Sequence, residues 1–330
     1  MKIAIMGSPQ AGQQQLFSIL TGIALETIQQ KPLEAHQGVC EVRDPRVTRL
    51  AELYKPKKTT YAKIDYILLP DLKLLKNADG VCWVARAENA GQDISAFIAE
   101  LIIADMMVVE KRLENIAKDQ KRKFEGQREK ENELMLACKQ QLDREKPLSG
   151  LTLTAEQAKL MRTYQFLTLK PVILGVNVPE KQVGDSALAK ELGEKFGLPA
   201  VQLCAELEEE ISRLEPGDRE AFMKELGIAE PAIEKMSRLA YAALGLLSFF
   251  TVGEDEVRAW TVSNGATAPD AGSVIHSDIE KGFVRAEMFK YDDFIAAGSE
   301  AKLKEQGKFH LKGRDYIVAD GDILSFRFNV

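Results

Sequence analysis

The sequence predicts an α/β protein with a parallel sheet, an inserted helical hairpin and a small C-terminal α+β domain. Short apolar runs alternate with helical patterns in residues 1–93 and again in residues 147–245, as expected of a parallel α/β sheet. A long helical pattern interrupts this alternation in residues 94–146. Strand-like runs joined by short turns dominate residues 246–330. These four ranges are the predicted domain boundaries.

The first strand, a glycine loop and the first helix follow one another directly. Residues 2–6 (KIAIM) form a short apolar run, and GSPQAGQQQ follows it. The apolar residues from Leu16 to Leu20 then predict a helix that ends at Gly22. Further strands are predicted at residues 39–42, 62–69, 80–85, 171–176 and 198–204.

The inserted segment predicts two helices that fold back on each other near Gly126. Apolar residues recur at helical spacing in the first half of the segment, stop in a charged middle, and recur again in the second half. Between Lys111 and Lys146 there are 11 Lys+Arg and 8 Asp+Glu, a local charge of +3. The hairpin is either a solvated pair of helices or an arm that contacts a partner such as RNA.

The last 85 residues predict a separate domain of mixed strands and short helices. LSFFTV and EVRAWTV are strand-like and are joined by a turn at residues 253–255. ILSFRFNV predicts a terminal strand.

Composition and charge narrow the class of protein. The chain has 330 residues, of which 45% are hydrophobic and 28% are charged, which excludes a fully disordered or collagen-like chain. The net charge of −6 argues against a strongly basic nucleic-acid binder. The four cysteines contain no CxxC pair, so we expect reduced thiols rather than a zinc site. Without a signal-like or membrane-length apolar run, we expect a cytoplasmic protein with no membrane partner.

The loop after the first strand has the spacing of a phosphate-binding loop but lacks its cation. Four residues separate Gly7 from Gly12, as in G-x-x-x-x-G-K-[ST]. In that motif the lysine contacts the β- and γ-phosphates and the hydroxyl binds Mg²⁺. Gln13 and Gln14 occupy these two positions. The candidate phosphate loop comprises Gly7, Ser8, Pro9, Gln10, Ala11, Gly12, Gln13 and Gln14.

The missing ammonium sets the expected affinity. Hydrogen bonds to charged groups contribute about 1.5–3 kcal/mol each, so triphosphate binding should weaken by at least ~10–100-fold. Hydrolysis should suffer more, because phosphoryl transfer depends on electrostatic stabilisation. We therefore expect weak ATP or GTP binding at most and no Mg²⁺. A purely structural strand–helix turn remains the alternative.

Four segments carry a resemblance that spans nearly the whole chain. They are GVCEVRDPRVTRLAELYKPKKTTYAKIDYI, LIIADMMVVEKRLE, LSFFTVGEDEVRAWTVSNGATAPDAGSVIHSDIEKGFVRAEMFKYDDF and DYIVADGDILSFRFNV. They resemble the Obg-like ATPase (YchF) family. The resemblance implies a P-loop GTPase-like domain with a helical, coiled-coil insertion, and a C-terminal TGS domain with a ubiquitin-like β-grasp fold.

Carried over residue by residue, the family's site is incomplete. The switch I threonine corresponds to Pro32, and the D-x-x-G motif corresponds to LLPD, with Leu68 and Asp71 at its ends. The base-reading N-x-x-E motif persists as Asn177 and Glu180 in NVPE, which the resemblance links to ATP. No catalytic or metal-binding residue is assigned.

These departures favour a pseudo-NTPase that acts as a binding or scaffold protein, and they leave open whether the chain is an enzyme. One alternative is an active ATPase or GTPase in which another cation, such as Lys31 or Lys76, enters the site. Another is a protein–protein adaptor without a nucleotide pocket.

The resemblance also implies ribosome or RNA contact through the TGS domain, and the helical arm is a second candidate. Residues from Leu247 onward have a net charge of −4, but basic residues cluster locally and could track phosphates. The candidate RNA-contacting residues are Lys281, Arg285, Lys290, Lys308, Lys312 and Arg314. An ordinary mixed surface is the alternative.

Overall fold

The computed structural model describes residues 1–119 and 127–329 and has two compact units. Unit 1 comprises Met1–Gly38 and Tyr66–Met236, and unit 2 comprises Val39–Asp65 and Ser237–Val330. The predicted hairpin turn near Gly126 lies outside the described residues. No helix in the described part of the chain combines the length and apolar character needed to cross a membrane.

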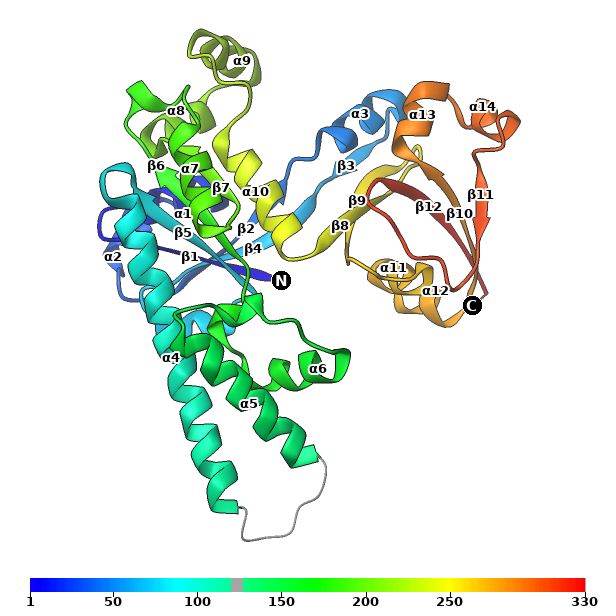
Figure 1. Cartoon of the computed structure of the whole chain (residues 1–330). Coiled ribbons are helices and arrows are strands. Elements are labelled where there is room, and N and C mark those ends of the chain that lie inside the picture. Colours follow the sequence, from blue (N-terminus) through cyan, green and yellow to red (C-terminus); the bar gives the residue numbers. More distant parts are fainter. Residues whose placement is uncertain (120–126, 330) are drawn as a thin grey trace. The chain divides into compact units, whose positions relative to one another are not determined.

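Unit 1 contains a sheet covered by helices (Figure 1). The sheet strands are β1 (Lys2–Gly7), β2 (His36–Val42), β4 (Ala62–Leu68), β5 (Gly80–Arg86), β6 (Val172–Asn177) and β7 (Ala200–Leu203). The α-helices are α1 (Gln13–Thr21), α2 (Leu25–Gln30), α4 (Ala90–Asp119), α5 (Gln127–Asp143), α6 (Ala155–Tyr164), α7 (Ala187–Phe196), α8 (Ala205–Arg213), α9 (Pro216–Glu225) and α10 (Ala232–Ala243). Short 3₁₀ turns are η1 (Leu72–Asn77), η2 (Ala87–Asn89), η3 (Leu148–Gly150), η4 (Leu167–Leu169) and η5 (Glu180–Gln182). The boundaries between the units fall within β2, β4 and at Met236 in α10.

The sheet has the order β2-β4-β1-β5-β6-β7. β1 pairs with β5, β5 with β6, and β6 with β7, all in parallel. Register pairs Gly7 with Val84, and Arg86 with Asn177. The carboxyl ends of β1, β5 and β6 therefore meet at one edge, where parallel α/β sheets commonly bind ligands.

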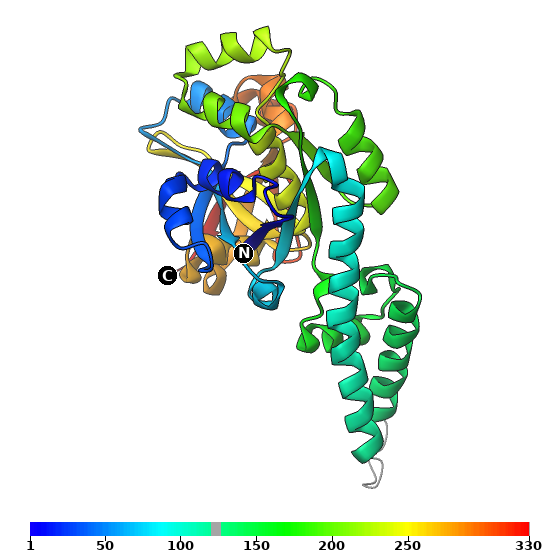
Figure 2. The same cartoon turned by 90° about the vertical axis from the view of Figure 1, so that its left-hand side faces the viewer.

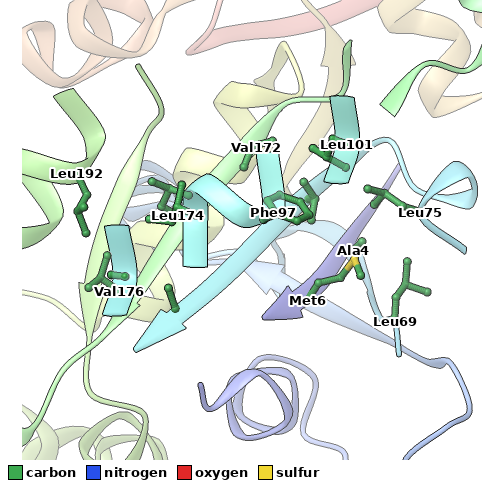
Figure 3. Close-up of a cluster of buried hydrophobic side chains, with 14 of the residues drawn as sticks. Ala4, Met6, Leu69, Leu75, Phe97, Leu101, Val172, Leu174, Val176 and Leu192 are labelled. Atoms are coloured by element: carbon green, nitrogen blue, oxygen red, sulfur yellow. The ribbon is translucent and has the colours of Figure 1, made fainter. Parts of the chain in front are cut away.

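A cluster of buried apolar side chains lies between this sheet and the helices that cover it. Figure 3 shows its labelled members, which come from β1, β6, η1, α4, α7 and the loop after β4: Ala4, Met6, Leu69, Leu75, Phe97, Leu101, Val172, Leu174, Val176 and Leu192. The central strands are buried along almost their whole length, which explains why their sequences read as continuous apolar runs.

α4 and α5 lie side by side and extend away from the sheet as an arm (Figures 1 and 2). Val109 and Ile116 of α4 pack in one apolar cluster with Leu134 and Cys138 of α5. Arg112 donates to both carboxylate oxygens of Glu131, at 2.8 and 2.7 Å. Tyr164 of α6 also donates to Glu131.

One buried carboxylate connects the base of the arm to the chain that follows α6. Asp105 of α4 is 1% exposed. It accepts hydrogen bonds from the backbone N–H of Leu167 at 2.7 Å, and from the N–H and hydroxyl of Thr168 at 2.8 and 2.6 Å. Burial raises the pKa of Asp105, while these donors act in the opposite direction.

Unit 2 contains a mixed sheet of the order β11-β10-β12-β8-β9-β3. Its strands are β3 (Lys58–Thr60), β8 (Leu246–Thr251), β9 (Glu256–Ser263), β10 (Phe283–Lys290), β11 (His310–Lys312) and β12 (Asp322–Phe328), and its helices are α3 (Pro45–Tyr54), α11 (Ala268–Ile275), α12 (Ser277–Lys281), α13 (Tyr291–Ala297) and α14 (Glu300–Glu305). β8 and β9 form an antiparallel hairpin, and β12 lies parallel to β8 and antiparallel to β10. This arrangement of β8 to β12 is that of a β-grasp fold.

Residues 39–65 are grouped with unit 2, although the strands β2 and β4 at the two ends of this segment pair within the unit 1 sheet. The predicted domain boundaries, which placed the whole segment with the N-terminal sheet domain, stay a prediction. β3 extends the unit 2 sheet by pairing in parallel with β9. Arg46 pairs with Asp320 at 2.6 Å, and Tyr54 donates to Glu300 at 2.8 Å. Contacts between residues so distant in sequence leave no local pattern.

Candidate functional site

The candidate phosphate loop connects β1 to α1, and both of its glycines are constrained. A Cβ at Gly7 would lie 2.6 Å from the Val84 carbonyl oxygen, an impossible approach. Gly12 is the N-cap of α1 and has a φ of 90°, a conformation that favours glycine. The α1 N-terminus has no side-chain cap, so no N-cap side chain accepts a hydrogen bond from its first backbone N–H groups.

Asn177 holds the loop in place from the end of β6. Its side-chain Nδ2 donates to the Ala11 carbonyl at 2.9 Å, and its Oδ1 accepts from the Ala205 backbone N–H at 3.0 Å. A Cβ at Gly12 would lie only 2.7 Å from that Nδ2. The asparagine therefore links the loop to the N-terminus of α8.

A cavity of about 430 Å³ lies at the end of β1, and we call it the phosphate-end cavity. Six of its lining residues stand at positions of the family's phosphate- and metal-binding motifs. Gly7 is retained from those motifs, and the five departures are Gln13, Gln14, Pro32, Leu68 and Asp71. Met6, Leu33, Glu34, Leu69, Pro70, Leu72, Trp83 and Glu100 complete its lining. Neither Trp83 nor Glu100 was singled out as a site residue in the sequence analysis. Trp83 stacks on Phe97 with ring centroids 4.0 Å apart, and it also lines the cavity.

The phosphate-end cavity is acidic. Glu34, Asp71 and Glu100 line it, and among the described residues no lysine or arginine does. Lys31 lies nearby but pairs with Glu34 at 3.0 Å. Neither Lys31 nor Lys76 lines the cavity. In the described part of the chain, no group of three or more His, Cys, Asp or Glu side chains could hold a metal ion.

A second cavity of about 330 Å³ lies on the other side of the loop, and we call it the base-end cavity. Its lining comprises Gln10, Gly12, Gln15, Arg86, Glu88, Asn177, Val178, Pro179, Cys204, Ala205 and Glu206. Burial, reinforced by the charges of Glu206 and Glu180, raises the pKa of the Cys204 thiol. Glu180 is exposed at the start of η5 and is not part of the lining.

Arg86 and Glu88 were missed by the sequence reasoning. Arg86 is the last residue of the central strand β5, and Glu88 follows it in η2. Their position at the sheet edge where ligands commonly bind was an available signal.

The six candidate RNA-contacting residues lie in unit 2 and do not share one face. Ala286 pairs with Lys312 across β10 and β11, so Arg285 and Lys312 lie on opposite faces of the sheet. Arg285 lies opposite Arg327 of β12. Lys281 ends α12 and is exposed.

The remaining members of this set have internal partners. Lys290 pairs with the fully buried Asp322, and Lys308 pairs with Asp293 at 2.6 Å. Arg314 donates to the Phe283 carbonyl at 2.9 Å. Lys281, Arg285 and Arg314 are exposed, whereas Lys290, Lys308 and Lys312 are partly buried.

A parallel α/β unit with a glycine loop between β1 and α1, in one chain with a C-terminal β-grasp sheet, defines a P-loop NTPase-like protein. Comparison with known proteins agrees. Residues 246–329 match the family YchF-GTPase_C, described as a protein of unknown function (DUF933).

Relatives and a solved structure match over essentially the whole chain. The ribosome-binding ATPase YchF of Bacillus subtilis (strain 168) is 35% identical over 361 residues, covering 99% of this chain and 98% of the relative. The protein of the same name from Haemophilus influenzae is 36% identical and covers 100% of this chain and 99% of the relative. The structure of the Schizosaccharomyces pombe YchF GTPase has a TM-score of 0.87 at 26% identity, covering 99% of this chain and 97% of that chain. The chain belongs to the YchF family, which confirms the resemblance and the predicted fold class.

Proposed function

We propose that this chain is a YchF-type protein with a degenerate nucleotide site that acts as a non-hydrolysing binding or scaffold protein at the ribosome. The observation that carries the proposal is the lining of the phosphate-end cavity. Gln13 and Gln14 occupy the lysine and hydroxyl positions of the phosphate loop, and three carboxylates line the cavity in place of a cation. A Mg²⁺–triphosphate carries a net negative charge, so its binding needs cationic groups of the protein at the phosphates.

The loop keeps its shape without a nucleotide contact from Asn177. Both polar atoms of this side chain bind backbone groups of the protein itself. This supports a role for Asn177 in shaping the loop. The base-end cavity, with Asn177 and Cys204–Glu206 in its lining, supports residual binding of ATP or GTP through the base, without tight phosphate contacts.

Equilibrium titration with ATP, GTP and their diphosphates, each with and without Mg²⁺, tests the proposal. We expect ATP to bind no more tightly than ADP and Mg²⁺ to have no effect, because the third phosphate and the metal gain no ligand. We also expect no turnover above background. Turnover that scales with protein concentration and disappears in a Gly7→Val variant would instead support an active ATPase with unorthodox phosphate contacts.

Ribosome association is proposed because relatives are named ribosome-binding ATPases. Contact would use basic residues of unit 2 and the α4–α5 arm, so binding should weaken as salt rises. Co-sedimentation with ribosomes tests this. We expect a Lys281→Glu/Arg285→Glu variant to pellet less than wild type. A control Lys190→Glu variant, at an exposed position of α7, should pellet normally. Equal pelleting of all three would remove these two residues from the contact.

A further inference from the structure

We propose that the phosphate-end cavity and the adjoining face of α4 dock a basic, amphipathic helical segment of a partner protein. A lysine or arginine of that segment enters the cavity, and its apolar residues pack on α4. The inference rests on the proposed function, because the cavity must be free of nucleotide phosphates.

The cavity matches the chemistry of a long basic side chain. Lysine and arginine combine an apolar stem with a cationic end. Met6, Leu68 and Leu69 provide an apolar wall, while Glu34, Asp71 and Glu100 provide carboxylates. The indole of Trp83 in the same wall also favours a cation.

The carboxylates are only partly engaged within the protein. Asp71 accepts the Lys73 backbone N–H at 2.8 Å through one oxygen. Glu34 pairs with Lys31, but both side chains are more than 60% exposed, at 62% and 61%, so this pair is weak and replaceable. Within residues 1–119 and 127–329, Glu100 has no ion-pair partner.

An exposed stripe on α4 continues from the cavity. Glu100 lines the cavity, and Ile103, Met107 and Glu110 follow it at spacings of three and four residues, which places all four on one helix face. Ile103 is 61% and Met107 is 68% exposed. The apolar packing of α4 against α5 uses other residues, including Val109 and Ile116. Glu110, at the far end of the stripe, pairs with Lys139 of α5 at 3.0 Å, whereas Ile103 and Met107 lie outside the apolar cluster of the arm.

Exposed apolar side chains also occur on the other segments that border the cavity. Leu33 is 86% exposed, and Leu74, two residues after the cavity residue Leu72, is 36% exposed. Apolar side chains next to carboxylates are complementary to a helix that carries apolar anchors flanked by lysine or arginine. The same carboxylates repel a nucleic acid, which selects a protein segment as the occupant.

Fluorescence titration with a synthetic peptide tests the proposal on the full chain. The probe is an amphipathic helix of about five turns, with leucines on one face and lysine and arginine on its flanks. The protein carries Trp260→Phe, so that Trp83 in the cavity wall is the reporter. We expect saturable binding and a change in Trp83 emission. A peptide of the same composition with a scrambled, non-amphipathic order should not bind.

Matched variants locate the site. Glu100→Lys and Ile103→Asp should each weaken peptide binding by at least about tenfold, with unchanged circular dichroism and thermal unfolding. Leu136→Asp, at a 51% exposed position on α5 of the same arm, should change it less than about twofold. Equal loss in all three variants would indicate non-specific adsorption and overturn the proposal.

Competition with nucleotide and with spermidine gives three further outcomes. If neither peptide nor nucleotide binds, the docking inference fails and the proposed non-hydrolysing function stands. If spermidine binds as tightly as the peptide and competes with it, the cavity is a small-cation site and the docking inference also fails. If Mg²⁺–ATP binds tightly and displaces the peptide, the proposed function fails, and the docking inference fails with it because the cavity is then a nucleotide site.

Discussion

The contact between Gly12 and Asn177 predicts a specific energetic coupling in the phosphate loop. Replacing Gly12 with alanine places a Cβ 2.7 Å from the Asn177 Nδ2. The asparagine must then move and give up its bonds to Ala11 and Ala205. In an Asn177→Ala background those bonds are already absent, so the same glycine substitution meets no obstacle from this side chain.

The magnitudes follow from these contacts. Asn177→Ala removes two hydrogen bonds of about 0.5–1.5 kcal/mol each and should cost about 1–3 kcal/mol of local stability. Gly12→Ala should cost about 1–2 kcal/mol for the left-handed backbone, plus most of the cost of displacing Asn177. The double variant loses the Asn177 hydrogen bonds only once. Its loss of stability should therefore be smaller than the sum of the two single-variant losses by about 1–2 kcal/mol.

Native-state hydrogen exchange of the loop and α1 amides measures this coupling directly, because it reports local opening free energies. Gly22→Ala is the control. Gly22 has a φ of 72° but open space around its Cβ position, so its cost should add to that of Asn177→Ala. Additive costs for Gly12→Ala and Asn177→Ala, or equal coupling between Gly22→Ala and Asn177→Ala, would refute the predicted coupling between Gly12 and Asn177.

Asp105→Ala should destabilise unit 1 by about 3 kcal/mol in urea unfolding, because it leaves two buried backbone N–H donors and one hydroxyl unsatisfied. Hydrogen bonding to Arg112 lowers the pKa of Glu131, so its contribution should be present above the ordinary glutamate pKa of about 4.3 and lost as pH falls through the lowered folded value. Circular dichroism between neutral and acid pH should therefore show a weaker acid dependence in Glu131→Gln. Burial raises the thiol pKa of Cys82 to about 12 and that of Cys138 to about 11, so both should react with thiol reagents at mildly alkaline pH only after unfolding.

Each of these expectations has a contrary outcome. Asp143→Ala, at an exposed pair on α5, should cost less than about 1 kcal/mol; an equal loss at Asp105 would argue against its role as a tie. If wild type and Glu131→Gln lose structure over the same acid pH range, Glu131 does not contribute to the pH dependence of stability. Rapid labelling of Cys82 or Cys138 in the folded protein would show that the core opens readily.

The sheet of unit 1 was predictable because its central strands are buried on both sides and read as apolar runs. The glycine loop was equally predictable, because close approach to Val84 and a positive φ both demand glycine. The full cavity lining was not predictable, because Trp83 and Glu100 reach the phosphate-end cavity from elements distant in sequence from the loop.

The composition of unit 2 was also beyond local patterns. β3 has only three residues, Lys-Thr-Thr, and its pairing partner β9 begins nearly two hundred residues later. Polar segments this short carry no strand signal. Arg46 likewise gives no indication in sequence that it pairs with Asp320.

The split origin of unit 2 has a consequence for synthesis on the ribosome. Residues 39–65 emerge early, but the rest of their unit begins at Ser237, roughly 170 residues and about 10–35 s of translation later. During that interval the early segment lacks its sheet partner β9 and the carboxylate of Asp320. The nascent segment therefore waits for its own C-terminal sequence, and a chain released before β9 is made cannot complete this unit.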